Sequence, residues 1–188
     1  HWKDQSGNGN DAEQNTPGSQ PQIHDGTVDT DLITENGKPA LKFANDDLAF
    51  LGTDAPLTSL FFVYRGAATR NYFLYEDANQ RMRWESNGAY LVKSGDYDFA
   101  SGFVQDDTQK LNVILRTGSS SATGYQDGTS VATWAGLTSS NWDFNKFGAT
   151  PSAVVYLQEL FVWESDQSSN RPDIEENINS EYLIYQPT

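Results

Sequence analysis

The residues best suited to holding a metal ion lie in the first loop of the chain. Asp4, Ser6, Asn8 and Gly9 have the spacing at which a helix–loop–helix calcium motif places its first three ligands and its turn glycine. The twelfth position of that motif is a bidentate glutamate, but here it is Asn15. Glycine and asparagine both tolerate positive φ angles, so the same composition suits a simple turn. The sequence therefore favours a backbone-shaping turn over a calcium site.

Acidic and amide side chains also crowd several later loops. Calcium takes six to eight oxygen ligands, which distant loops can supply together. No single loop carries a full set, so a calcium site would have to be shared between loops. We expect no cofactor and no tightly bound metal, with a shared calcium site as the alternative. The candidate oxygens belong to Asp4, Asn8, Asn10, Asp11, Asn45, Asp46, Asp47, Asp96, Asp98, Asp106 and Asp107.

Carbohydrate binding is the second chemistry that the side chains suit, because sugars are held by an aromatic face and planar polar groups. Strand alternation in RMRWE places Arg83 and Glu85 opposite the apolar residues of that segment. The same alternation in KLNVILRT separates Asn112 and Arg116 from the leucines and valine. If the apolar sets face the core, these four residues share a polar sheet face. The alternatives are ordinary surface charges and core tryptophans. The expected ligand-binding residues are Arg83, Glu85, Tyr90, Asn112, Arg116, Trp134 and Trp142, of which the tyrosine and tryptophans lie near turns.

Short strands are the elements that would position these side chains. From Pro39 onward, β-branched and aromatic runs alternate with Gly, Asn, Asp or Ser. Asp127-Gly128 and Asn87-Gly88 suit the two-residue type I′ turns of hairpins. With no helices between the strands, the pattern predicts an all-β antiparallel sandwich of the jelly-roll kind. The expected strands are 40–43, 47–51, 59–65, 71–76, 81–85, 89–93, 110–117, 122–126, 129–134 and 153–163.

One short helix is expected near the C-terminus. Pro172 suits a first helical turn, and Asp173 complements the positive end of the helix dipole. Ile174, Ile178 and Tyr182 recur at i, i+4 and i+8, so one face of this helix can pack on the sandwich.

Composition limits both the partners and the organisation. The 26 acidic residues outnumber the 12 lysines and arginines, giving a formal charge of −14 that repels nucleic acids and anionic membrane surfaces. No apolar stretch approaches the ~18 residues of a membrane helix, so we expect no membrane insertion. With no cysteine, neither a disulfide framework nor thiol catalysis is open to the chain. We expect residues 1–188 to form a single domain, excised from a longer protein.

Four segments, taken in order, resemble the concanavalin A-like lectin/glucanase superfamily in its laminin-G-like form. Such modules occur in bacterial surface proteins and in phage tail or capsid-decorating proteins. The resemblance implies a jelly-roll fold, an extracellular, cell-surface or virion location, and a structural role for the opening turn. It does not by itself indicate a function, because one fold serves many. The segments are WKDQSGNGNDA with PQI, ENGKPALKFANDDL, GYQDGTSVA, and FGATPSAVVYLQELFVWES with IEENINSEY.

Catalytic carboxylates of the kind found in that superfamily are missing. Its glucanases carry carboxylates at i, i+2 and i+4 on one strand, which aims them into one cleft. Here the nearest analogue is ELFVWE, in which Glu159 and Glu164 fall on opposite faces of a strand. A convergence of Glu76, Glu85 and Glu159 from separate strands is the other route to a catalytic pair.

These observations favour a non-enzymatic module that binds carbohydrate or recognises a receptor on a surface or virion protein. Its expected partner is a polysaccharide or cell-surface glycan. The first alternative is a structural, assembly or spacer domain that contacts neighbouring virion or adhesin domains. The further alternative is a glycoside hydrolase or polysaccharide lyase.

Overall fold

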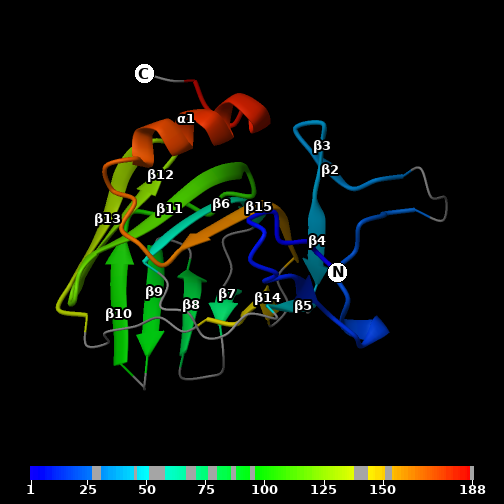
Figure 1. Cartoon of the computed structure of the whole chain (residues 1–188), viewed down its shortest axis with the longest axis horizontal. Coiled ribbons are helices and arrows are strands. Elements are labelled where there is room, and N and C mark those ends of the chain that lie inside the picture. The colour runs from blue at the N-terminus through cyan, green and yellow to red at the C-terminus, as the bar shows by residue number, and fades with distance from the viewer. Residues whose placement is uncertain are drawn as a thin grey trace.

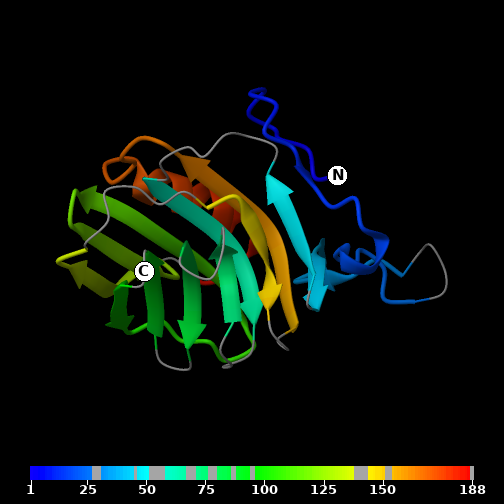
Figure 2. The ribbon, with the colours of Figure 1, turned by 90° about the horizontal axis from the view of Figure 1, so that it is seen from below.

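Two antiparallel sheets face each other across an apolar core, and one helix covers the outer face of one of them (Figure 1). The structure is a computed structural model that describes residues 1–26, 31–44, 46–50, 58–66, 71–75, 80–85, 88–93, 96–137, 144–150 and 154–186. The predicted all-β sandwich with a C-terminal helix is confirmed. In the view of Figure 2 the two sheets are seen from the side away from the helix.

The strands are ordered as follows. The seven-stranded sheet has the order β1 (Ala12–Glu13), β5 (Asp47–Phe50), β14 (Lys146–Thr150), β7 (Asn71–Tyr75), β8 (Gln80–Glu85), β9 (Gly88–Lys93) and β10 (Asp96–Ser101). The six-stranded sheet has the order β13 (Thr129–Ala135), β12 (Ser121–Gln126), β11 (Gln109–Gly118), β6 (Ser59–Gly66), β15 (Val154–Trp163) and β4 (Leu41–Ala44). A small hairpin of β2 (Thr34–Glu35) and β3 (Lys38–Pro39), a 3₁₀ turn at Pro17–Ser19 and the helix α1 (Arg171–Tyr182) complete the described elements.

Aromatic rings from both sheets fill the core between them. Phe62 of β6 lies with its ring centroid 4.1 Å from that of Phe73 of β7. The ring centroid of Trp84 in β8 lies 4.9 Å from that of Phe103, which follows β10. All four side chains are fully buried. Contacts of this kind add to the free energy gained from burying aromatic surface, so this cluster helps to hold the two sheets together.

The outer face of the six-stranded sheet is apolar as well, because α1 packs on it. Leu111 and Val113 of β11 belong to a second apolar cluster together with Ile178 of α1. Ile174 and Tyr182 are partly buried against the same cluster, so the predicted docking face of the helix is confirmed.

Both faces of β11 are therefore buried, and the predicted orientation of this strand is wrong. Its leucines and valine face the helix, whereas Ile114 packs in the core between the sheets. By strand alternation Asn112 lies on that inner face, where it is fully buried. The amide of Gln126 donates a hydrogen bond to Asn112 Oδ1 at 2.9 Å and also binds the backbone of Val104. The buried amides thus satisfy each other, which explains how polar groups are accommodated there.

The two predicted hairpin turns have different outcomes. Asp127 and Gly128 have φ angles of 51° and 80°, and Gln126 pairs with Thr129, as a type I′ turn requires. In the other hairpin Glu85 pairs with Gly88, so the glycine is the first residue of β9 and not a turn residue. Asn87 lies outside the described residues.

A pH dependence arises where α1 meets the β12–β13 hairpin. Burial raises the pKa of Glu175, Arg171 opposes that shift, and Asp127 adds to it. Because the folded protein then binds the proton more tightly than the unfolded chain, this group lowers stability as pH rises from about 4.5 toward 7. We expect Glu175→Gln to gain stability relative to the parent protein over that interval, measured as urea midpoints at several pH values. Glu176→Gln, an exposed change on the same helix, controls for the loss of one helical carboxylate. A difference for Glu175→Gln that does not change with pH would contradict the prediction.

Candidate functional site

A row of polar and aromatic side chains crosses the outer face of the seven-stranded sheet. In β8, Met82 and Trp84 face the core, so Arg83 takes the outer face by alternation, as predicted. Arg83 is paired in register with Tyr90 of β9, and Tyr90 is paired with Phe99 of β10. Residues paired in register point to the same face of a sheet, so these three form one row.

Contacts along this row hold its polar members in place. The Arg83 guanidinium lies over the Tyr90 ring, 4.6 Å from its centroid, and Arg83 Nε lies 3.0 Å from Glu85 Oε1. The ring centroids of Tyr90 and Phe99 are 4.6 Å apart. The Arg83 side chain is only 9% exposed, whereas Phe99 is 40% exposed. An oriented guanidinium and carboxylate therefore lie beside an accessible aromatic ring.

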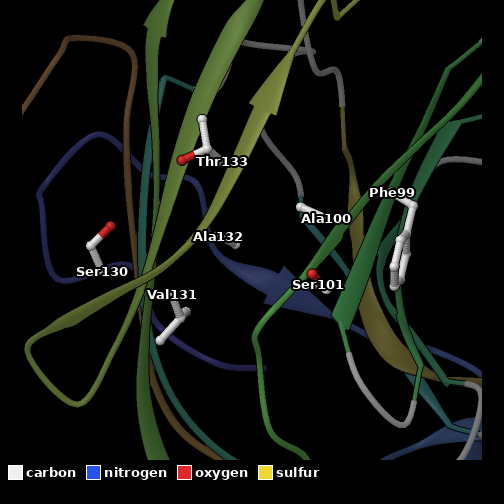
Figure 3. Close-up of a pocket in the computed structure, with 7 residues that line it drawn as sticks. All are labelled: Phe99, Ala100, Ser101, Ser130, Val131, Ala132 and Thr133. Atoms are coloured by element: carbon white, nitrogen blue, oxygen red, sulfur yellow. The ribbon is translucent and has the colours of Figure 1, made fainter.

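A groove of about 410 Å³ opens at the edge of this row (Figure 3). It lies between β10 and β13, which are the end strands of the two sheets as described. Phe99 lines the groove and also contacts Tyr90, so the row and the groove are continuous. Figure 3 shows the Phe99 ring on the side of β10 away from β13, so the ring borders the groove and does not fill it. The lining residues are Phe99, Ala100 and Ser101 of β10 and Ser130, Val131, Ala132 and Thr133 of β13.

A second set of polar and aromatic residues extends the same face toward β14. Tyr75 pairs in register with Arg81 and with Lys146. Its hydroxyl donates to Asp47 Oδ2 at 3.0 Å, and Lys146 Nζ lies 5.7 Å from its ring centroid. Burial and the Asp47 carboxylate raise the pKa of Tyr75, which keeps the hydroxyl protonated as a donor. Sequence reasoning missed Tyr75, Lys146 and Phe99, and it considered Asp47 only as a metal ligand, because only the pairing of strands brings these residues onto one face.

The other predicted ligand-binding residues do not join this face. Asn112 and Arg116 belong to β11 in the opposite sheet, and both are buried, so the predicted shared polar face is wrong. Arg116 instead donates to the carbonyls of Gly118 and Ser119 in the following turn. Trp134 is 2% exposed, and its indole N–H donates to Asp98 O at 3.1 Å. Trp142 lies outside the described residues.

The carboxylates considered for catalysis lie apart. Glu85 pairs with Arg83 on the seven-stranded sheet. Glu159 belongs to the six-stranded sheet and accepts a hydrogen bond from the Tyr182 hydroxyl of α1 at 2.6 Å. These two groups lie on the outer faces of opposite sheets and cannot flank one glycosidic bond. Glu76 lies outside the described residues.

The opening loop is the turn that its composition predicts. The Asp4 carboxylate accepts hydrogen bonds from Ser6 N at 2.8 Å, Ser6 Oγ at 2.8 Å and Asn10 N at 2.9 Å. These bonds lower the pKa of Asp4. Asp11 pairs with Lys3 and accepts from Asp4 N. The carboxylates therefore stabilise the loop itself.

The remaining metal candidates are dispersed. The Asp46 carboxylate accepts a hydrogen bond from Ala44 N at 2.9 Å, and the Asp47 carboxylate accepts one from the Tyr75 hydroxyl. Among the described residues, no three His, Asp or Glu side chains are grouped so as to hold a metal ion. Asn8 uses its backbone N–H to bond Ser6 Oγ, and Asn45 lies outside the described part of the chain. In that part, no helix has the length and apolar character needed to span a bilayer.

Comparison with known proteins adds evidence on the fold. No family model matches the chain, and no curated protein matches its sequence. The chain superposes on the binding domain of Paraclostridial Mosquitocidal Protein 1 with a TM-score of 0.67 and 14% identity, over 95% of this chain and 49% of that one. For the binding domain of botulinum neurotoxin DC in complex with SialylT, the TM-score is 0.64 and the identity 12%, over 95% of this chain and 48% of that one. For the same domain in complex with rat synaptotagmin II, the TM-score is 0.61 and the identity 14%, with the same two coverages. The chain thus spans about half the length of these structures, and at this identity the likeness shows the fold alone.

Proposed function

We propose that this domain is a non-enzymatic binding module that recognises carbohydrate on an extracellular or cell-surface receptor. The observation that carries the proposal is the continuous row of Arg83, Tyr90 and Phe99 beside the groove between β10 and β13. The groove, at about 410 Å³, falls in the range of 300–1,000 Å³ typical of ligand pockets.

The chemistry of the row suits a sugar. The exposed Phe99 ring offers an apolar face for the C–H surface of a pyranose ring. The Glu85 carboxylate, whose side chain is 24% exposed, supplies acceptors for hydroxyl groups, and the largely buried Arg83 guanidinium orients that carboxylate. Since Arg83 is already held by Tyr90 and Glu85, little side-chain freedom remains to be lost on binding. The site is therefore preorganised for a polar, ring-shaped ligand.

The comparisons support the same class of function. The matched structures are binding domains, one in complex with SialylT and one in complex with rat synaptotagmin II. Because this chain corresponds to about half of each, those ligands belong to larger domains. From the comparisons we therefore infer only receptor recognition, and carbohydrate as the ligand rests on the row beside the groove. The jelly-roll organisation is compatible with the concanavalin A-like superfamily and with a place on a surface or virion protein. A domain of this kind would work outside the cell.

The test is a screen of the purified domain on a broad glycan array, with and without calcium, followed by variants measured on the best ligand. Phe99→Ala removes an exposed ring, and Arg83→Lys keeps the charge but loses the planar fork, so each is expected to weaken binding about tenfold, or about 1.4 kcal/mol. Val162→Ala, which trims another exposed apolar side chain on β15, should bind like the parent domain. Thermal melting of each variant checks that folding is intact. Absence of binding to every glycan, or equal loss in the control, would favour a spacer domain instead.

A further inference from the structure

A second polar pocket lies on the opposite sheet, away from the row of Arg83, Tyr90 and Phe99. Tyr156 of β15 is paired in register with Lys42 of β4 on one side and with Arg65 of β6 on the other. These three side chains therefore share one face, the outer face of the six-stranded sheet. A pocket of about 320 Å³ lies over them.

The N-terminal segment forms the far wall of this pocket. Isolated bridges join Gln22 to Lys42 and His24 to Leu32, which brings the residues around Asp25 and Leu32 over the sheet. The β2–β3 hairpin stands beside β4 (Figure 1) and is fixed to β15, since the Gln158 amide donates to Glu35 O at 2.9 Å. Backbone bridges and the Gln158 hydrogen bond thus hold this wall in place. Its members are Asp25, Leu32, Ile33, Thr34 and Glu35.

The two cations of the pocket are held very differently. Arg65 Nη1 lies 2.6 Å from Glu35 Oε1, its Nε lies 3.1 Å from Asp107 Oδ1, and its guanidinium stacks 4.7 Å from the Tyr156 ring centroid. Lys42 has one ion pair within the described residues, to Asp25 at 3.4 Å. The Asp25 side chain is 73% exposed, and the Lys42 side chain is 22% exposed. A long, exposed pair of this kind contributes little stability, so Asp25 is readily replaced.

We propose that this pocket binds a sugar ring that carries one carboxylate, such as a uronic or sialic acid residue, with Lys42 as the contact for the carboxylate. The ligand carboxylate takes the place of Asp25 and makes a charge-assisted hydrogen bond to the Lys42 ammonium. The ring lies against Leu32 and Tyr156, and its hydroxyls meet Thr34 and Glu35.

The charge of the lining determines the charge of the ligand. Arg65 is already neutralised by two carboxylates, Glu35 in the lining and Asp107 beside it. Once Asp25 swings into solvent, Lys42 loses the ion pair that the described residues give it, and its single positive charge matches a monoanion. The second charge of a dianion would be repelled by the Glu35 carboxylate. A neutral sugar has no carboxylate to replace Asp25, so the Lys42–Asp25 ion pair would stay formed and would occupy the site. Because the whole chain carries −14, attraction at long range cannot select an acidic ligand, and the contact itself must do so.

The experiment compares three glycosides by NMR titration of the purified domain: methyl glucuronide, methyl sialoside and methyl glucoside. We expect the acidic glycosides to shift resonances of Leu32, Thr34 and Tyr156, and the neutral one to bind at least tenfold more weakly. Lys42→Gln should weaken acidic binding at least tenfold, whereas Asp25→Asn should strengthen it about threefold, because a competing carboxylate is lost. Lys38→Gln removes the same charge from a pair with Glu181 outside the pocket and serves as the matched control.

Each outcome decides the proposal. Binding of both acidic glycosides supports the class, and binding of only one identifies the source of the carboxylate. Equal binding of the neutral glycoside, a loss of affinity in Asp25→Asn, or shifts confined to Tyr90 and Phe99 would overturn it. The Phe99→Ala variant should leave this binding unchanged, so failure here is distinguishable from failure of the site on the seven-stranded sheet.

Discussion

A chain truncated before Asn170, and so lacking α1, is expected to lose its cooperative native structure. The helix covers an outer sheet face whose side chains are fully buried or nearly so. Burying an apolar side chain of this size is worth about 1.5–3 kcal/mol, so exposing five of them would cost about 7.5 kcal/mol or more. That is comparable with the 5–15 kcal/mol by which a typical domain is stable. The five residues are Phe61, Val63, Leu111, Val113 and Leu115.

Urea unfolding followed by circular dichroism, together with binding of a hydrophobic dye, measures this effect. The truncated chain should bind dye and lose its unfolding transition, or precipitate. Leu183→Ser alters a residue just after the helix that is 75% exposed, and it should change stability by less than about 0.5 kcal/mol. A truncated chain with the parent's urea midpoint would show that the sheet, and not the helix, protects this face.

The fold was largely predictable because most of its longer strands carry strong local signals. Five described strands were not predicted: the two-residue strands β1, β2 and β3, and the longer β10 and β14, which explain the limit. β10 has the sequence DYDFAS, and its aspartates suggest a loop. It is an end strand, and charged residues are common there because they discourage pairing with other chains. β14 has only five residues with a glycine in the middle, which weakens the signal for a strand.

The site was predictable only where alternation alone decides the outcome. Arg83 and Glu85 follow from the pattern of β8, whose inner face is apolar and whose outer face is polar. Asn112 and Arg116 were misplaced because β11 is apolar on the face that α1 covers, and alternation does not say whether a sheet or a helix lies there. The pairing of Tyr90 with Phe99 depends on register, which is set by the whole sheet.

Gly102→Ala is expected to be the most damaging single substitution beside the groove. Gly102 follows β10 with a φ of 122°, and a Cβ there would lie 1.9 Å from Val131 O of β13. The substitution adds backbone strain of order 1–3 kcal/mol to a clash with a main-chain atom that cannot rotate away. We expect a loss of at least about 3 kcal/mol, which lowers the melting temperature by roughly 6–12 °C in a chain of this size.

A matched glycine separates the clash from the strain. Gly136, just after β13, has a φ of 80° and open space around its Cβ position, so Gly136→Ala meets the strain alone. Its loss should be near 1 kcal/mol, and ligand binding should be unaffected. Gly102→Ala should also weaken glycan binding in conditions where it remains folded, because β10 and β13 must move apart and the groove that Phe99 lines then changes shape. Equal losses for the two variants would mean that β10 and β13 are not held at contact distance, and the groove between them would then not be a fixed site.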